Sequence, residues 1–259
     1  MALNNNRDRQ RTRVVYVPVN TGGGSGSQAK IKVGENGIKL GSSTFTEIPQ
    51  GLDFSDVTDM SYMFQSCYNL TIFPEIDTSN VTNMRYMFKF SYNLTNISEI
   101  DTSNVTNMEG IFYYCQSLTT VPKMNTSQVT NVNYMFSDCR TLTSIPTLDI
   151  SNVTDLYNMF YGCSSLTTIP EMNTSNVIGT YNAFRDCTSL TDLGGFIGLK
   201  CNLDLSASSL ITHESIMNVI NKAEDVTASP ATLTLGSTNL AKLTDEEKAI
   251  ATNKGWTLA

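Results

Sequence analysis

The chain has 259 residues, an apolar fraction of 40% and a net charge of −7, with only 16% charged residues. This apolar fraction is sufficient for a sizeable core. No stretch approaches the about 18 consecutive apolar residues of a membrane-spanning helix, and neither end has the apolar segment of a secretory signal or a membrane anchor. We therefore expect neither membrane insertion nor ordinary secretion.

Residues 1–21 are predicted to form a basic, extended arm, because four arginines stand against a single acid, Asp8. The arm ends in a β-prone run, residues 13–19, that is too short to fold alone. Such a run is typical of a strand that pairs with the sheet edge of another protein, so we expect a docking tether. Nucleic acid is a weaker interpretation, because no aromatic platform accompanies the arginines. The predicted docking residues are Arg7, Arg9, Arg11, Arg13, Val15, Tyr16 and Val17.

Residues 22–28 begin with GGGSGS and are predicted to be a flexible Gly/Ser linker. Residues 29–52 follow, and within them Ile31 to Leu40 alternates in hydropathy around a glycine-containing turn. This pattern predicts a hairpin that covers the first coil of whatever comes next. We interpret residues 29–52 as an N-terminal cap.

Residues 53–194 contain six tandem units of 24 residues. The octapeptide DTSNVTNM, for example, occurs at residues 77–84 and again at 101–108. Three apolar rows keep the same spacing: Val57, Val81, Val105, Val129, Val153 and Val177; Phe64, Phe88, Phe112, Phe136, Phe160 and Phe184; Leu70, Leu94, Leu118, Leu142, Leu166 and Leu190. No single unit can bury its apolar side chains alone, so the repeat predicts a stack of coils around one continuous core.

Each unit is predicted to contain a short helical turn followed by a strand. Val105, Met108 and Phe112 fall on one face of a helix or 3₁₀ turn, which Ser103 and Asn104 would cap. Downstream, the apolar residues of the segment 118–124 all point inward if the segment is extended. Six stacked strands would form a parallel sheet about 30 Å long.

The run DTSNVTNM-x-YMF-x-x-C-x-x-LT resembles the BspA-like branch of leucine-rich-repeat proteins, the bacterial surface protein repeat. That resemblance implies a right-handed solenoid and a role in attachment. Bacterial members usually carry a signal peptide and an anchor, neither of which this sequence has. The predicted fold class is therefore an α/β repeat: a right-handed leucine-rich-repeat-like solenoid with a parallel sheet and six units, capped at both ends and preceded by the arm.

Residues 195–259 are predicted to be a C-terminal α+β cap. Residues 209–226 have the apolar spacing of a helix, residues 232–235 that of a strand, and Thr244 with Glu247 has the spacing of a capping box that opens a second helix. The segment resembles the closing module of repeat proteins encoded by tailed phages and prophages of gut bacteria. This resemblance implies a virion protein.

Three rows of reactive side chains suggest chemistry, but each has a structural interpretation that we prefer. The cysteine row is expected to be a ladder of buried free thiols rather than disulfides, and it has no C-x-x-C pair or second histidine beside His213 for zinc. The Asp/Asn row can bind calcium or cap turns, and we favour turns because no Gly-rich loop surrounds it. The rows are Cys67, Ser91, Cys115, Cys139, Cys163 and Cys187; Asp53, Asp77, Asp101, Asn125, Asp149 and Asn173; Glu75, Glu99, Lys123, Thr147 and Glu171.

The third row could supply a carboxylate pair for glycoside cleavage, but Lys123 and Thr147 interrupt it, as on a solvated edge. His213 lies far from the repeats and cannot activate a nucleophile in each of them. We therefore expect no enzyme, no catalytic or metal-binding residues and no cofactor.

Positions that vary between units gather around the M-x-x-M-F segment, and many of them are aromatic. They are Tyr62, Tyr86, Tyr113, Tyr114, Tyr134, Tyr157, Tyr161 and Tyr181, together with Phe90. Tyrosine offers a large contact area at low entropic cost, so this strip predicts a binding face. The same residues can instead pack between neighbouring coils, and the sequence supports both interpretations.

We therefore expect a structural or binding protein, most simply a phage virion accessory protein such as a decoration, fibre or host-adhesion module. The arm would bind other virion proteins within a homo- or hetero-oligomeric assembly, and the solenoid would bind a host surface protein or glycan. The alternatives are a bacterial cell-surface adhesin and a carbohydrate-binding or carbohydrate-active protein.

Overall fold

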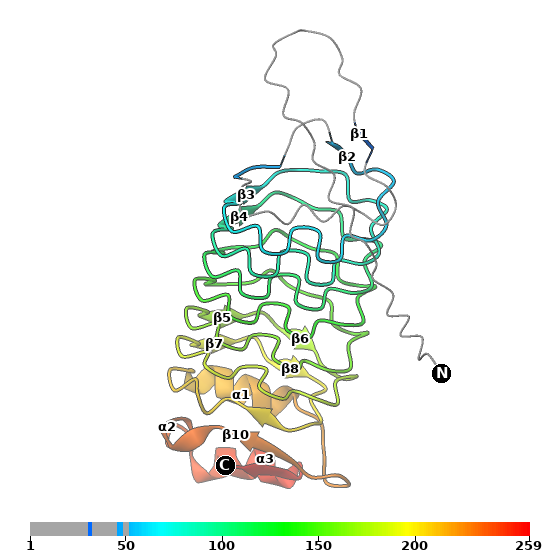
Figure 1. Ribbon diagram of the computed structural model, residues 1–259. Helices are drawn as coiled ribbons and strands as arrows, with labels where there is room; N and C mark the ends of the chain where they lie inside the picture. The colour runs from blue at the N-terminus through cyan, green and yellow to red at the C-terminus, as the bar shows by residue number, and fades with distance from the viewer. Residues whose placement is uncertain (1–30, 33–45, 49–51) are drawn as a thin grey trace, which may run out of the picture.

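The computed structural model describes residues 31–32, 46–48 and 52–259 of the chain. Within them the chain winds into a rod of stacked coils, with three helices at the C-terminal end (Figure 1). Residues 24 apart in sequence lie side by side on neighbouring coils, for example Asn83, Asn107 and Asn131, which form successive parallel bridges. The predicted arm and linker, residues 1–28, lie outside the described residues.

The segment around M-x-x-M-F is a series of turns, and the helical turn that we predicted there is not present in the described repeat. Successive N–H groups alternate between a partner in the same coil and a partner in the next coil. The N–H of Met87 bonds to the carbonyl of Met84 in its own coil at 3.1 Å, and the N–H of Phe88 bonds to the carbonyl of Ile111 in the next coil at 2.9 Å. Two residues per coil have left-handed φ, for example Tyr86 at 52° and Phe90 at 63°. A left-handed residue every fourth position cannot belong to an α-helix.

Hydrogen bonds outside the turn segment run the other way along the rod. The N–H of Thr95 bonds to the carbonyl of Thr71 at 2.8 Å, and the N–H of Thr106 to that of Thr82 at 2.9 Å. Each coil therefore both donates to the next coil and accepts from it.

The predicted parallel sheet is present only as short two-residue pieces. The strands of the repeat region are β2 (Leu52–Asp53), β3 (Ile72–Phe73), β4 (Asn96–Ile97), β5 (Thr168–Ile169), β6 (Met172–Asn173), β7 (Asp192–Leu193) and β8 (Phe196–Ile197). All of their pairings are parallel: β3 with β4, β5 with β7, β6 with β8, and β2 with β1 (Ile31–Lys32).

Proline explains why the sheet is interrupted. The N–H of Ser98 bonds to the carbonyl of Phe73 at 2.9 Å, and the N–H of Gly194 to that of Ile169 at 2.8 Å, which closes the β3–β4 and β5–β7 pairs. At the same repeat position the middle coils have Pro122, Pro146 and Pro170. Proline has no N–H, so this ladder bond cannot form there.

The core is one continuous column of apolar side chains along the rod. Its centre is the phenylalanine row from Phe64 to Phe184, in which neighbouring rings stack with centroids 5.3–5.9 Å apart. Every member of this row is fully buried, which stabilises the fold by about 1.5–3 kcal/mol per side chain. The 24-residue register continues to β8, slightly beyond the boundary at residue 194 that we predicted.

The C-terminal part combines helices with a three-stranded parallel sheet in the order β11-β10-β9. Its elements are β9 (Leu203–Asp204), α1 (His213–Lys222), β10 (Ala231–Thr234), α2 (Gly236–Leu240), α3 (Asp245–Asn253) and β11 (Trp256–Leu258). The predicted capping box is confirmed: Thr244 Oγ1 accepts from the N–H of Glu247, and the Glu247 carboxylate accepts from the N–H of Thr244. Lys222, at the end of α1, joins this part to the repeats through Glu171.

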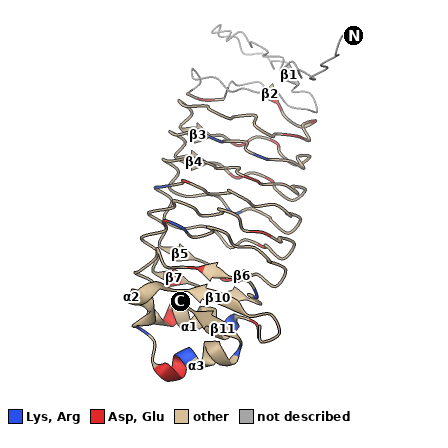
Figure 2. Cartoon of the chain, turned by 60° about the horizontal axis from the view of Figure 1, so that its bottom comes forward, with Lys and Arg blue, Asp and Glu red and all other residues tan. Residues whose placement is uncertain are grey.

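No helix among the described residues is long and apolar enough to cross a membrane. Charged side chains are sparse along the coils and denser around α3 (Figure 2).

Candidate binding face

The predicted tyrosine strip lies along one face of the rod, and five of its tyrosines fall at two adjacent repeat positions. Tyr62, Tyr86 and Tyr134 occupy one of them, and Tyr157 and Tyr181 occupy the position one residue earlier. Where the tyrosine moves, Asn158 and Asn182 take over the left-handed position, with φ of 53° at both. Asparagine tolerates this conformation well, so the exchange is possible without backbone strain.

The rings form one unbroken row of contacts, in which the first four are tilted or edge-to-face and the last, between Tyr157 and Tyr181, is stacked. The centroids of successive rings lie 5.3 Å apart between Tyr62 and Tyr86, 6.1 Å between Tyr86 and Tyr113, and 5.6 Å between Tyr113 and Tyr134. The series continues at 5.2 Å to Tyr157 and 5.4 Å to Tyr181. We call these six residues the tyrosine face.

The packing interpretation of the strip is confirmed, and the binding interpretation stays a prediction. The rings pack between coils, yet most of them remain half-buried rather than buried, and Tyr181 is 64% exposed. Phe90 and Tyr114 pack beside Tyr113, with ring centroids 5.7 Å and 4.8 Å from it. The remaining predicted residue, Tyr161, is half-buried and lies under the guanidinium of Arg185 at 6.0 Å.

A glycine in the third coil leaves room for the ring of Tyr86 in the tyrosine face. Gly110 stands where the neighbouring coils have Tyr86 and Tyr134, and its φ is +56°. A Cβ atom at Gly110 would lie 2.1 Å from Cε1 of Tyr86. The ring of Tyr86 thus fills the space that a side chain at position 110 would occupy.

An ion pair borders the first half of the face. Arg85 Nε lies 2.9 Å from Glu109 Oε2, and Asn131 Nδ2 lies 3.3 Å from the same oxygen. Burial alone would raise the pKa of Glu109, but hydrogen bonds from Arg85 and from the Tyr86 hydroxyl outweigh it and lower this pKa. Burial, together with the bond to the Glu109 carboxylate, raises the pKa of Tyr86.

A positive charge lies over three aromatic rings beside this pair. Lys89 Nζ is 4.7 Å from the ring centroid of Tyr86, 4.9 Å from that of Phe90 and 5.2 Å from that of Tyr113. Such cation–π contacts fix the lysine against the face at little cost in solvation. The face therefore combines aromatic edges, hydroxyl groups and a localised positive charge.

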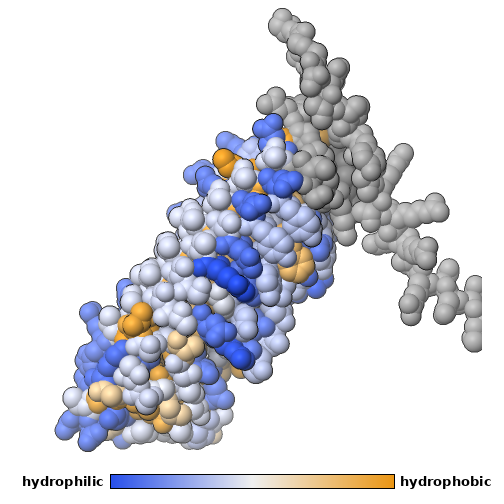
Figure 3. All heavy atoms as spheres, turned by 60° about the vertical axis from the view of Figure 1, so that its left-hand side comes forward, coloured by the Kyte–Doolittle hydropathy of each residue, from blue (hydrophilic) through white to orange (hydrophobic). Residues whose placement is uncertain are grey.

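The tyrosine face ends at a groove of about 1010 Å³ between the last repeat and the C-terminal part. Tyr181, Asn202 and Thr232 are among its lining residues, and they come from three successive rungs of the stack. Seen from the side, most of the rod surface has intermediate or hydrophilic character, and hydrophobic patches lie toward the end away from the grey residues (Figure 3).

Sequence reasoning missed this groove and a second aromatic pair. Tyr68 and Tyr92 are both exposed and stack at 5.5 Å with an interplanar angle of 10°. Their spacing of 24 residues was the signal that could have identified them. The groove has no such signal, because it lies where the repeat ends. The predicted docking residues of the arm, from Arg7 to Val17, lie outside the described residues.

The cysteine ladder is confirmed. All six cysteines are free, and the five of the row are buried. Each thiol from Cys115 onward donates to a phenylalanine carbonyl 27 residues earlier, for example Cys163 Sγ to Phe136 O at 3.0 Å. Ser91 makes the same contact with Phe64 O at 2.9 Å. Burial raises the pKa of the Cys187 thiol to about 12.

The turn-capping interpretation of the Asp/Asn row is also confirmed. Asp101 Oδ1 accepts from the N–H of Ser103 at 2.9 Å, and Asn125 Oδ1 accepts from that of Ser127 at 3.1 Å. Ser103 and Asn104 cap no helix; the Asn104 amide donates to Ser79 O at 2.7 Å instead. Within the described residues no three His, Cys, Asp or Glu side chains are grouped as metal ligands would be.

The glutamate row separates into two environments. Glu75 and Glu99 line a shallow hollow of about 640 Å³ on neighbouring coils, whereas Glu171 pairs with Lys222 at 2.5 Å. His213 begins α1, and its Nε2 lies 2.8 Å from Glu247 Oε1. It therefore links the start of α1 to α3.

A family model described as "Mycoplasma protein of unknown function, DUF285" matches residues 41–143 and 90–195. Among curated proteins, none matches the chain. Two solved structures are similar: a leucine-rich-repeat protein of T. pallidum, at 17% identity, 81% coverage of both chains and a TM-score of 0.39, and a leucine-rich-repeat protein of Bacteroides ovatus, at 14% identity, 88% and 87% coverage and a TM-score of 0.19.

Proposed function

The chain belongs to the DUF285 family, described as Mycoplasma protein of unknown function, and from the geometry of its repeats we propose that it is a non-enzymatic binding protein. The observation that carries this proposal is the unbroken row of ring contacts from Tyr62 to Tyr181 along one face of the rod. Because each ring is held by its neighbours, the surface is preorganised and a partner binds it with a small ordering cost.

The partner that fits this face is another protein. Because the rings contact one another at different angles, the face presents a mixture of ring edges and planes, with hydroxyl groups and the charge of Lys89. Tyrosine edges with interspersed arginine and lysine are typical of protein–protein interfaces. A surface of this kind holds no arrangement of nucleophile and base for catalysis.

Site-specific photocrosslinking tests the proposal. The photoreactive residue benzoylphenylalanine is placed at Tyr86 or Tyr157 on the face, and at Ile250 of α3, an exposed control position. We expect one defined protein to be crosslinked from both positions on the face and not from Ile250, in cells or particles that contain the full chain. Equal labelling from all three positions would contradict the proposal.

We also propose, in finer detail, a right-handed solenoid of six units of leucine-rich-repeat type, closed by residues 29–52 and 195–259, with residues 1–21 as the docking tether. The support for a virion role is the resemblance of the C-terminal segment to repeat proteins of tailed phages and prophages. A bacterial cell-surface adhesin is equally consistent with the repeat and with the family.

Deletion of residues 1–21 and fractionation of the producing cell separate these roles. For a virion protein we expect the full chain to sediment with particles, and the shortened chain to lose this association while keeping its thermal unfolding transition. Surface accessibility of the chain on cells without particles would favour the adhesin. Loss of the thermal transition in the shortened chain would contradict the tether.

A further inference from the structure

The tyrosine face ends at Tyr181, whose ring contacts only one other tyrosine of the face. One plane of Tyr181 lies against Tyr157, at 5.4 Å and an interplanar angle of 16°. The side chain is nevertheless 64% exposed, and it lines the groove at this end of the face. The ring is thus held by one neighbour and remains accessible to a ligand.

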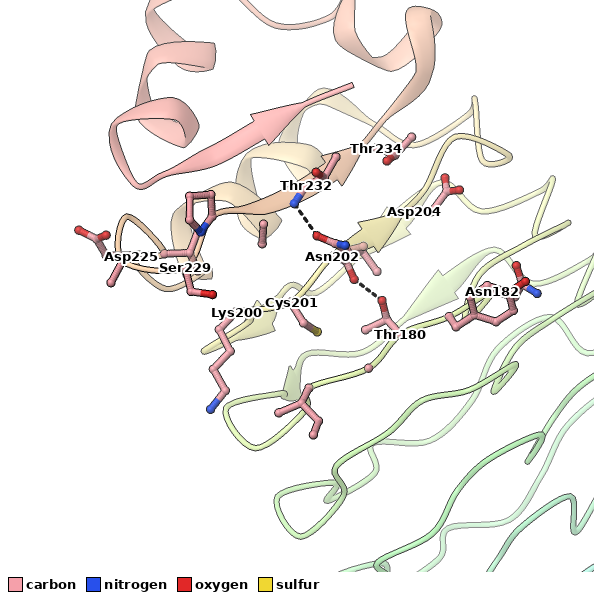
Figure 4. Close-up of a pocket in the computed structure, with 18 residues that line it drawn as sticks. Thr180, Asn182, Lys200, Cys201, Asn202, Asp204, Asp225, Ser229, Thr232 and Thr234 are labelled. Atoms are coloured by element: carbon pink, nitrogen blue, oxygen red, sulfur yellow. Dashed lines mark hydrogen bonds between the residues drawn. The ribbon is translucent and has the colours of Figure 1, made fainter.

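The next two rungs contribute small polar residues to the groove. Asn202 and Thr232 line the groove of about 1010 Å³ that opens beside Tyr181. They are held in place: Thr180 donates from its hydroxyl to the carbonyl of Asn202, and Asn202 Oδ1 accepts from the N–H of Thr232 at 2.8 Å. Figure 4 shows Asn202 between Thr180 and Thr232, joined to both by these bonds.

The groove has hydrogen-bonding groups to spare. With its Oδ1 occupied, the amide of Asn202 has its Nδ2 donor available for a ligand. Asp204 Oδ1 accepts from the N–H and hydroxyl of Ser206, at 2.9 Å and 2.6 Å, which leaves Oδ2 without a partner among the described residues.

The backbone adds another donor at the same edge. In the preceding coil the N–H of Asn158 bonds to Tyr181 O at 3.0 Å, but in the described part of the chain the equivalent N–H of Asn182 bonds to nothing. A backbone donor without a partner is a place where a ligand oxygen gains a full hydrogen bond.

We propose that this groove is a binding site for a neutral saccharide, a function beyond the protein contact that we assign to the tyrosine face. A pyranose has an apolar face of C–H groups that fits an open aromatic ring, and its hydroxyl groups donate and accept in turn. The groove supplies that combination: the plane of Tyr181, the amide donors of Asn202 and Asn182, and the acceptor oxygen of Asp204.

Two other ligands fit less well. An extended peptide cannot add a strand along this coil, because Asn182 and Asp186 have φ of 53° and 62°, outside the β region. An anion such as phosphate would meet the carboxylates of Asp204 and Asp225, which line the groove together with Lys200. Neutral hydroxyl groups have neither difficulty.

The test begins with the full chain on an array of immobilised neutral and acidic glycans. A neutral glycan that binds is then titrated by calorimetry against the wild-type chain and its variants. We expect Tyr181→Ala to weaken binding by about tenfold or more and Tyr181→Phe, which keeps the ring, by less than about threefold. We expect Asn202→Asp, which keeps the acceptor for Thr232 but removes the amide donor, to weaken binding by about fivefold or more.

Tyr92→Ala is the matched control, because Tyr92 is also exposed and stacked on one tyrosine but lies outside the groove. It should leave the affinity unchanged, and each variant should keep the thermal transition of the wild type. Binding to no neutral glycan, binding only to acidic ones, or equal affinity after Tyr181→Ala would overturn the proposal. Crosslinking from Tyr86 does not depend on the groove, so this failure and a failure of the proposed function are distinguishable.

Discussion

Arg85 and Glu109 occupy the same position of successive repeats and form a two-point ion pair, with Arg85 Nε and Nη2 at 2.9 Å and 3.1 Å from the two carboxylate oxygens. Their side chains are 40% and 17% exposed. A repeat of identical units would place like charges next to each other here. This chain instead places opposite charges on two neighbouring coils, and the Arg85 guanidinium lies over the Tyr86 ring, 4.9 Å from its centroid.

Replacing Glu109 with Gln should destabilise the fold by about 0.5–1 kcal/mol at neutral pH, the range of a partly exposed pair. Because the folded pKa of Glu109 is lowered, its contribution is present above the unfolded pKa of about 4.3 and is lost as the pH falls through the folded value. Chemical denaturation at pH 7 and at pH 3 measures the difference. An equal difference between the two proteins at both pH values would show that the charge plays no part.

Gly110→Ala should disrupt the tyrosine face, because the new Cβ overlaps the Tyr86 ring and the residue has left-handed φ. We expect the free energy of unfolding to fall by about 2–3 kcal/mol. The left-handed φ alone would account for only about 1 kcal/mol of this loss. Gly162→Ala is the control: its φ is +71°, but its nearest neighbour is Asp138 Oδ1 at 3.0 Å, which needs to move far less. Similar melting temperatures for the two variants would contradict a role for the Tyr86 contact.

The buried thiols should be unreactive in the folded protein. Only Cys201 is half-buried, so Ellman's reagent should label about one thiol in native buffer and all six in denaturant without reductant. A disulfide in the row would lower the count in denaturant. Rapid labelling of several thiols in the native state would indicate that the coils open.

The same thiols should make the fold sensitive to alkali. Burial raises the pKa of Cys115, Cys139, Cys163 and Cys187 in the folded state. The thiols therefore contribute fully to the free energy of unfolding below the unfolded pKa of about 8.5. Above it the unfolded chain ionises first, and the contribution decreases by up to about 1.4 kcal/mol per pH unit for each thiol.

Serine offers a matched variant for this effect, because Ser91 already makes the equivalent hydrogen bond in the second coil. The combined Cys→Ser variant at the four positions should unfold with a flatter pH dependence between pH 8 and pH 11. An unchanged slope would assign the alkaline loss of stability to tyrosines instead. The two proteins can be compared by denaturant midpoints at each pH.

Thr244→Ala should cost about 1 kcal/mol, the usual value for the loss of an N-cap. It removes the acceptor for the N–H of Glu247 at the start of α3. Thr244→Ser keeps this oxygen and should restore most of the stability. Circular dichroism during thermal unfolding is a sufficient measurement, and equal midpoints for the Ala and Ser variants would contradict the capping role.

Much of the architecture was predictable from spacing alone. The rows led by Val57, Phe64 and Leu70 indicated which side chains are buried, and the capping box at Thr244 located α3. The helical turns were predicted wrongly, because apolar residues at positions such as 105, 108 and 112 recur with the same spacing in a helix and in a series of turns. Left-handed φ at Tyr86 or Phe90 distinguishes the two, and nothing in a tyrosine or phenylalanine indicates it.

The candidate site was predictable only in part. The tyrosines could be identified as variable positions, and the sequence shows that the tyrosine moves by one position between Tyr134 and Tyr157. Which rings contact one another follows only from the stacking of the coils. The groove beside Tyr181 depends on Asn202 and Thr232, whose places on the rod follow from loops that do not obey the 24-residue period.

The two opposed sets of hydrogen bonds along the rod have an electrostatic consequence. The N–H groups of the turn segments, such as that of Phe88, point toward the C-terminal end, whereas those of Thr95 and Thr106 point toward the N-terminal end. Their peptide dipoles oppose one another, whereas in an α-helix all of them add. A stack of this kind can be lengthened by whole coils without accumulating partial charge at either end, so its length is not limited by its own field.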